Sequence, residues 1–109
     1  MSHELLDEIS LELGRRTAAR LRQQPDLIHV ARENLSRWAN QNSKSPALLR
    51  CYAEWQALLD QPLEALCAVL TSDNEEGRRL RQNSPFAGVL TPSEVWEVKR
   101  QFRHAATTT

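Results

Sequence analysis

Proline constrains the fold of this chain more than any other residue, because most of its five prolines mark points where one helical pattern gives way to the next. Proline fixes φ and lacks an N–H donor, so it is tolerated in the first turn of a helix and disfavoured further in. Pro25, Pro46, Pro62 and Pro92 each precede apolar residues spaced three and four apart. The chain is therefore predicted to be a series of short helices.

The same apolar spacing sets the helices that we expect, and no alternating pattern indicates a strand. The expected fold class is all-α: a compact bundle of five or six helices with short loops. We expect a single helical domain over residues 1–105 and a frayed C-terminal tail over 106–109. The expected helices cover about 3–23, 25–41, 46–60, 62–70, 74–82 and 92–105.

Local signals support several of these helix ends. Ser72 and Glu75 have the spacing of a capping box, and so have Thr91 and Glu94, where a proline follows the cap. Inside the first predicted helix, Gly14 is unfavourable, since glycine costs roughly 1 kcal/mol relative to alanine in a helix interior.

The composition is that of a globular protein and limits where it can work. The chain has 109 residues, 40% of them hydrophobic and 26% charged, and it contains no apolar run near the ~20 residues of a membrane span. Its beginning lacks a basic region followed by an apolar stretch, so we expect no signal peptide, no membrane association and a cytoplasmic location. Cys51 and Cys67 lie in apolar helical patterns, where reduced core cysteines are expected.

Charge is distributed in blocks although the net charge is zero. Residues 1–14 carry four acids and no base, and residues 15–50 carry eight bases and two acids. Residues 51–77 carry six acids and no base, and residues 78–109 carry six bases and two acids. Such blocks can steer a charged partner, or they can pair with one another within the bundle. The sequence leaves both interpretations open.

Catalytic motifs are not found. The chain has no glycine-rich phosphate loop and no serine in a nucleophile elbow. Its three histidines, His3, His29 and His104, are far apart and have no metal-ligand spacing. We therefore expect a protein that is not an enzyme, with no catalytic residues, no metal site and no cofactor.

The run from Arg78 to Trp96 combines arginines with an apolar loop and is the strongest candidate for a binding surface. Arginine and aromatic side chains are enriched in binding hot spots. The candidate partner-binding residues are Arg78, Arg81, Phe86, Val89 and Trp96. The alternative is that the apolar members of this set close the core.

A second interpretation of the same run is contact with nucleic acid. The predicted helices 62–70 and 74–82 have roughly the lengths of a helix-turn-helix unit, and Arg78, Arg79 and Arg81 are the candidates for contacting phosphates. Acidic residues at the start of the second helix oppose this reading, because they would meet phosphate repulsion there.

Two segments also resemble a known kind of protein. Arg-Arg-Leu-Arg-Gln-Asn-Ser-Pro-Phe-Ala-Gly-Val-Leu-Thr-Pro, residues 78–92, and Asn-Leu-Ser-Arg-Trp, residues 34–38, resemble short bacterial proteins of unknown function encoded near toxin-type genes. The resemblance implies an antitoxin-like role, in which the protein binds a toxic partner protein and masks it. The alternatives are a small helical DNA-binding transcriptional regulator, which as an antitoxin could also repress its own promoter, and a structural adaptor within a larger assembly, for which a homo-oligomer would be evidence.

Overall fold

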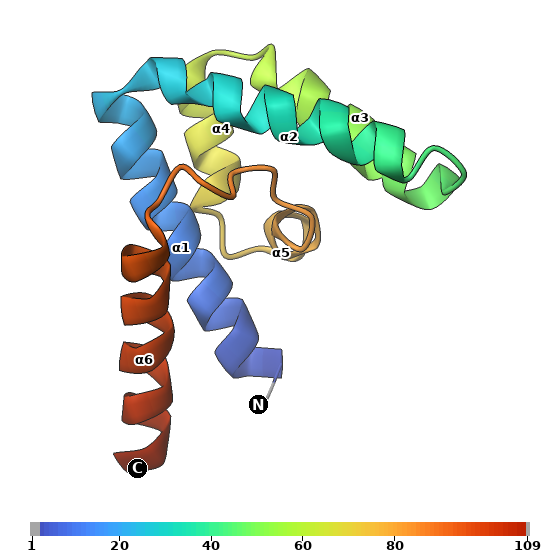
Figure 1. Cartoon of the computed structure of the whole chain (residues 1–109). Coiled ribbons are helices and arrows are strands. Elements are labelled where there is room, and N and C mark those ends of the chain that lie inside the picture. The colour runs from blue at the N-terminus through green and yellow to red at the C-terminus, as the bar shows by residue number, and fades with distance from the viewer. Residues whose placement is uncertain (1–2, 109) are drawn as a thin grey trace.

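A computed structural model describes residues 3–108, and within them every regular element is a helix and no strand is present (Figure 1). This confirms the expected fold class, an all-α bundle with short loops. The elements in chain order are α1 (His3–Gln23), the 3-10 helix η1 (Pro25–Leu27), α2 (Ile28–Gln41), α3 (Pro46–Leu59), α4 (Leu63–Leu70), α5 (Glu75–Arg81) and α6 (Pro92–Thr108).

The prolines lie at the starts of these elements as predicted, except that Pro25 begins a 3-10 helix and not α2. Pro46 and Pro92 are the first residues of α3 and α6, and Pro62 is the N-cap of α4. Pro25 begins the 3-10 turn and not the first turn of α2, because the Leu27 N–H bonds the Gln24 carbonyl at 3.1 Å in a three-residue step. Helix α6 continues to Thr108, beyond the predicted end near Ala105.

Only one of the two predicted capping boxes forms. At α6, the Glu94 N–H donates to Thr91 Oγ1 at 3.1 Å and the Thr91 N–H donates to Glu94 Oε1 at 3.0 Å. The box predicted from Ser72 and Glu75 is wrong, because α5 begins only at Glu75. Its N-cap is Asn74, whose side-chain oxygen accepts from the Gly77 N–H at 2.7 Å.

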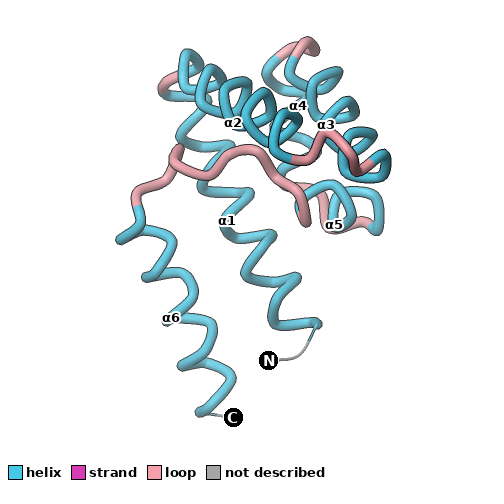
Figure 2. Tube along the Cα trace, turned by 45° about the vertical axis from the view of Figure 1, so that its right-hand side comes forward, coloured by secondary structure: helices cyan, strands magenta, loops and turns pink. Residues whose placement is uncertain are grey.

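Helix α1 is the centre of the arrangement. It packs against α4, α5 and α6, while α2 and α3 pack on each other as a pair. Helix α6 runs antiparallel to α1, so both ends of the chain lie at the same end of the molecule (Figures 1 and 2). In the described part of the chain, no helix is both long and apolar enough to cross a membrane.

The core forms where α1, α3 and α4 meet the loop between α5 and α6. Trp55 is fully buried and donates from Nε1 to the Leu80 carbonyl at 2.9 Å. Its ring meets Phe86 edge to face, with 5.8 Å between ring centroids. Both cysteines are free thiols; Cys67 is buried among these residues and Cys51 is half-buried. Trp55 thereby fixes the end of α5 and the following loop onto α3.

Candidate functional site

Arg81, the last residue of α5, is a buried cation that joins three helices. It is only 6% exposed. Its Nε donates to Ser10 Oγ at 3.2 Å, and its Nη1 donates to the carbonyls of Ser72 at 2.6 Å and Val69 at 3.3 Å. These carbonyls lie at or just after the C-terminal end of α4, where helix carbonyls lack intrahelical partners. Arg81 therefore caps α4 and holds α1 and α5 against it.

The charge of Arg81 has no counter-ion in direct contact. Among the described residues, no carboxylate lies within ion-pair distance of it, and its Nη2 is buried without any hydrogen-bond acceptor. Burial lowers the pKa of the guanidinium, partly offset by the more distant carboxylates of Asp73 and Asp7. Arginine nevertheless stays protonated in proteins, so the site holds a positive charge.

Two glycines make room for this arrangement. A Cβ on Gly14 would lie 2.1 Å from the Leu70 carbonyl oxygen and 3.3 Å from Arg81 Cδ. A Cβ on Gly77 would lie 2.7 Å from the Ser72 carbonyl oxygen. The close approach of α1 to α4, and of α5 to the turn before it, thus depends on the missing side chains.

The loop of residues 82–91 is held by a buried asparagine of α2. Asn34 Nδ2 donates to the carbonyls of Pro85 at 2.8 Å and Ala87 at 2.9 Å, and its Oδ1 accepts from Arg37 at 2.6 Å. The two segments that carry the resemblance therefore contact each other. Sequence reasoning missed Asn34, although a signal existed: it lies three residues after Ala31 and four before Trp38, on the apolar face of the helix.

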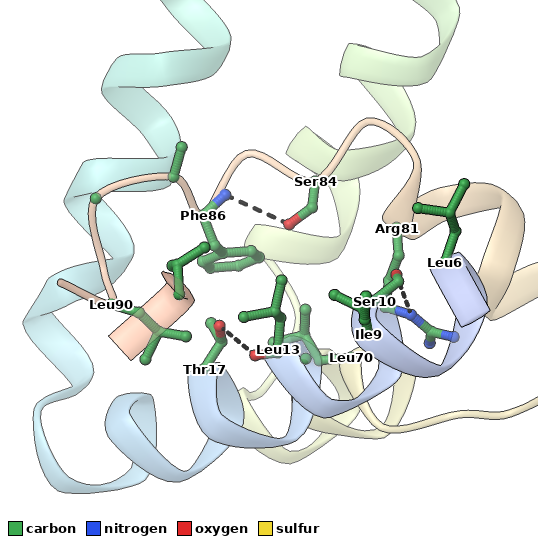
Figure 3. A pocket seen from close by; sticks show the side chains of 14 residues that line it. Leu6, Ile9, Ser10, Leu13, Thr17, Leu70, Arg81, Ser84, Phe86 and Leu90 are labelled. Carbon is green, nitrogen blue, oxygen red and sulfur yellow. Dashed lines mark hydrogen bonds between the residues drawn. The ribbon is translucent and has the colours of Figure 1, made fainter. Parts of the chain in front are cut away.

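A pocket of about 350 Å³ lies between α1 and this loop (Figure 3). Arg81 and Ser10 lie at one end, and Leu90 and Thr17 lie at the other. The Thr17 hydroxyl is engaged, since it donates to the Leu13 carbonyl at 2.7 Å. The lining is otherwise mostly apolar and comes from α1, α4, the loop and α6: Leu6, Ile9, Leu13, Gly14, Leu70, Ser84, Phe86, Ala87, Gly88, Leu90 and Val95.

The predicted partner-binding residues are not all at the surface. Phe86 and Val89 are 5% and 4% exposed and belong to the core, and Arg81 is buried as described. Arg78 is partly exposed and donates to the Asp73 carbonyl at 3.0 Å. Trp96 is 58% exposed, more than any other large hydrophobic side chain that the structure describes. Binding of a partner by this set stays a prediction, and Trp96 is its most accessible member.

Trp96 lies on a basic face of α6. The Arg103 guanidinium carbon lies 6.0 Å from the Trp96 ring centroid, in the range of a cation–π contact. Lys99 and Arg100 are three and four residues along the helix from Trp96, so they share this side. Within the described residues, none of these three cations forms an ion pair. We call Trp96, Lys99, Arg100 and Arg103 the α6 face.

The arginines predicted to contact phosphates have acceptors inside the protein. Arg79 forms ion pairs with both Glu54 and Glu76. Its hydrogen bonds hold the pKa of each carboxyl below its usual range. Arg78 pairs with Asp73, and Arg81 donates to the carbonyls of Val69 and Ser72. Contact of these residues with nucleic acid would require at least some of these bonds to be exchanged.

Comparison with known proteins adds no family to this description. The chain matches no protein-family model, no curated protein and no solved structure at a significant level. Within the described residues, no three side chains of His, Cys, Asp or Glu are grouped so that they could hold a metal ion. Function must therefore be argued from the α6 face, the pocket and the buried arginine.

Proposed function

We propose that this protein is a non-enzymatic, antitoxin-like regulator of the bacterial cytoplasm that binds a partner protein and masks it. The observation that carries the proposal is Trp96, a large aromatic side chain left 58% exposed on α6. Tryptophan and arginine dominate binding hot spots because they bury much surface while keeping a polar or charged group available. The antitoxin-like part of the proposal depends on the resemblance of residues 34–38 and 78–92.

The charge of the α6 face defines the kind of partner surface that would fit. Lys99, Arg100 and Arg103 have no intramolecular ion pair among the described residues, so their charge is available to a partner. A complementary surface would carry carboxylates around an apolar pocket that receives Trp96. Such complementarity mainly raises the association rate and excludes wrong partners.

Protein is favoured over DNA as the partner. Exposed Glu97 lies within the same helix, and the neighbouring helix α1 begins with exposed Glu4 and Glu8. These carboxylates would repel a phosphate backbone, which is negative along its whole length, whereas a protein partner can place cations opposite them and carboxylates opposite Lys99, Arg100 and Arg103. The arginines Arg78, Arg79 and Arg81 already have acceptors in the chain. A DNA-binding regulator and a structural adaptor stay alternatives, and a separate experimental result would favour each of them.

The test is co-purification and co-expression with the product of the adjacent gene. We expect a complex whose affinity falls about 30-fold in Trp96→Ala, the loss of a hot spot of about 2 kcal/mol. Gln56→Ala is the matched control, because it also truncates an exposed side chain, but on α3. A complex indifferent to Trp96→Ala would overturn the proposed surface.

Failure to find any protein partner would overturn the proposed role itself. A gel shift with the upstream DNA that weakens steeply with salt would favour the autorepressing regulator. A stable high-order homo-oligomer in light scattering would favour the adaptor.

A further inference from the structure

We propose that the pocket between α1 and the loop of residues 82–91 binds a small apolar monocarboxylate. Its carboxylate would lie at the Ser10 and Arg81 end, and its apolar tail would extend along Leu13 and Phe86 toward Leu90 (Figure 3). A medium-chain fatty acid is the simplest member of this class.

The buried charge is the first argument for an anionic ligand. All three acceptors that Arg81 bonds are neutral oxygens, and Nη2 has none. Burying an uncompensated charge is costly, and natural proteins usually pair such a group. A carboxylate at this end of the pocket would bring Arg81 a counter-charge nearer than the carboxylates of Asp73 and Asp7.

Ser10 is the group through which a carboxylate can engage the cation. Its Oγ accepts from Arg81 Nε at 3.2 Å, so its own hydroxyl hydrogen is left to donate. Among the described residues, that hydroxyl has no acceptor within the protein. Because Nη2 is shielded from solvent, the Ser10 hydroxyl is the accessible donor, and the guanidinium behind it strengthens its bond to an anion.

The rest of the pocket selects the tail. A volume of about 350 Å³ falls at the small end of ligand sites, which run from about 300 to 1,000 Å³. The far end is lined by Phe86 and Leu90, and the Thr17 hydroxyl there is already bonded to Leu13. A polar tail would therefore lose its hydrogen bonds to water without replacement. Leu6, 48% exposed, lines the pocket at the Arg81 end, so the carboxylate rather than the tail would lie nearer to solvent (Figure 3).

This site is separate from the surface invoked for the partner protein. Trp96 is not among the residues that line the pocket, and α6 contributes only Val95 to it. Absence of ligand binding would therefore leave the proposed partner-binding surface intact, and absence of a partner protein would leave the proposed ligand site intact.

The experiment measures binding of three ten-carbon probes to the full chain by calorimetry, below their aggregation concentrations. We expect saturable one-to-one binding of decanoate, roughly tenfold or more tighter than decanol, because a hydrogen bond to a charged group exceeds that of a neutral one. Decylamine should not bind, because its cation would meet Arg81. Equal affinity for decanoate and decanol, or no decanoate binding, would overturn the proposal.

Three variants locate the site. Ser10→Ala should weaken decanoate roughly tenfold and leave decanol unchanged. Leu13→Trp should abolish binding of both decanoate and decanol, because the larger side chain fills the pocket. Circular dichroism and thermal unfolding would check that this variant is folded. Trp96→Ala is the control and should bind decanoate like the wild type. Decanoate binding that survives Leu13→Trp in a folded protein would place the ligand elsewhere and reject the site.

Discussion

At the scale of single residues, Gly14 shows how packing can reverse a local preference. Alanine would favour the helix by roughly 1 kcal/mol. Its Cβ, however, would lie 2.1 Å from the Leu70 carbonyl oxygen, a backbone atom that could move away only if the backbone of α4 shifted. We therefore expect Gly14→Ala to destabilise the protein by about 1–3 kcal/mol, the usual cost of overpacking, as measured by urea unfolding.

The control for Gly14→Ala is Ala19→Gly in the same helix, at an exposed position. It should destabilise the protein by roughly 1 kcal/mol, which is the difference in helix propensity between alanine and glycine without any change in packing. If Gly14→Ala instead stabilised the protein by a similar amount, the close contact between α1 and α4 would be refuted.

Asn34 is the second residue whose role depends on its surroundings. Asn34→Asp replaces a donor to the Pro85 and Ala87 carbonyls with a carboxylate that repels both. We expect a loss of about 1–3 kcal/mol or more at pH 7, measured by urea unfolding. The deficit should shrink as the pH falls, because a protonated aspartic acid regains one donor. Asn40→Asp makes the same change at an exposed position of α2 and should cost at most about 1 kcal/mol, through the helix dipole.

At the scale of elements, the start of α6 is fixed by side chains that the sequence itself reveals. Thr91→Ala removes the oxygen that accepts from the Glu94 N–H, and we expect a loss of about 1 kcal/mol in thermal or urea unfolding. Thr91→Ser keeps the oxygen and is the matched control. Equal destabilisation by both substitutions would argue against capping as the cause.

The same cap predicts a pH dependence. The Thr91 N–H, with help from the Arg20 guanidinium, lowers the pKa of Glu94 below its ordinary value of 4.5. A lowered pKa means that the stabilisation is present above 4.5 and lost as the pH falls through the lowered pKa. Glu94→Gln should therefore be less stable than wild type at pH 7, and the difference should narrow toward pH 3. A difference that stays constant with pH would rule out this role of the carboxylate.

At the scale of the whole molecule, the sequence predicted the helices well and the site poorly. The helices follow from apolar spacing and proline, which are local signals. Arg81 looked like a surface cation because its burial depends on Gly14 and Gly77, whose roles appear only once α1, α4 and α5 are in contact. Phe86 and Val89 could equally have been core or interface, since periodicity does not say which neighbours cover a loop. Trp96 is exposed because, among residues 3–108, no other element covers that side of α6.

Helix α6 should also be less stable locally than α4. Its main contact is α1, whereas α4 packs against α1, α3 and α5. Local stability follows such packing, so native-state hydrogen exchange should give a lower opening free energy for amides of α6 after Val98 than for those of Leu66 and Leu70 in α4. A partner bound to the α6 face would slow exchange in α6 by binding the closed form. Equal opening free energies in α4 and α6 would instead mean that the chain opens as one cooperative unit. In the complex, a slowing of hydrogen exchange that is confined to other helices would place the partner elsewhere.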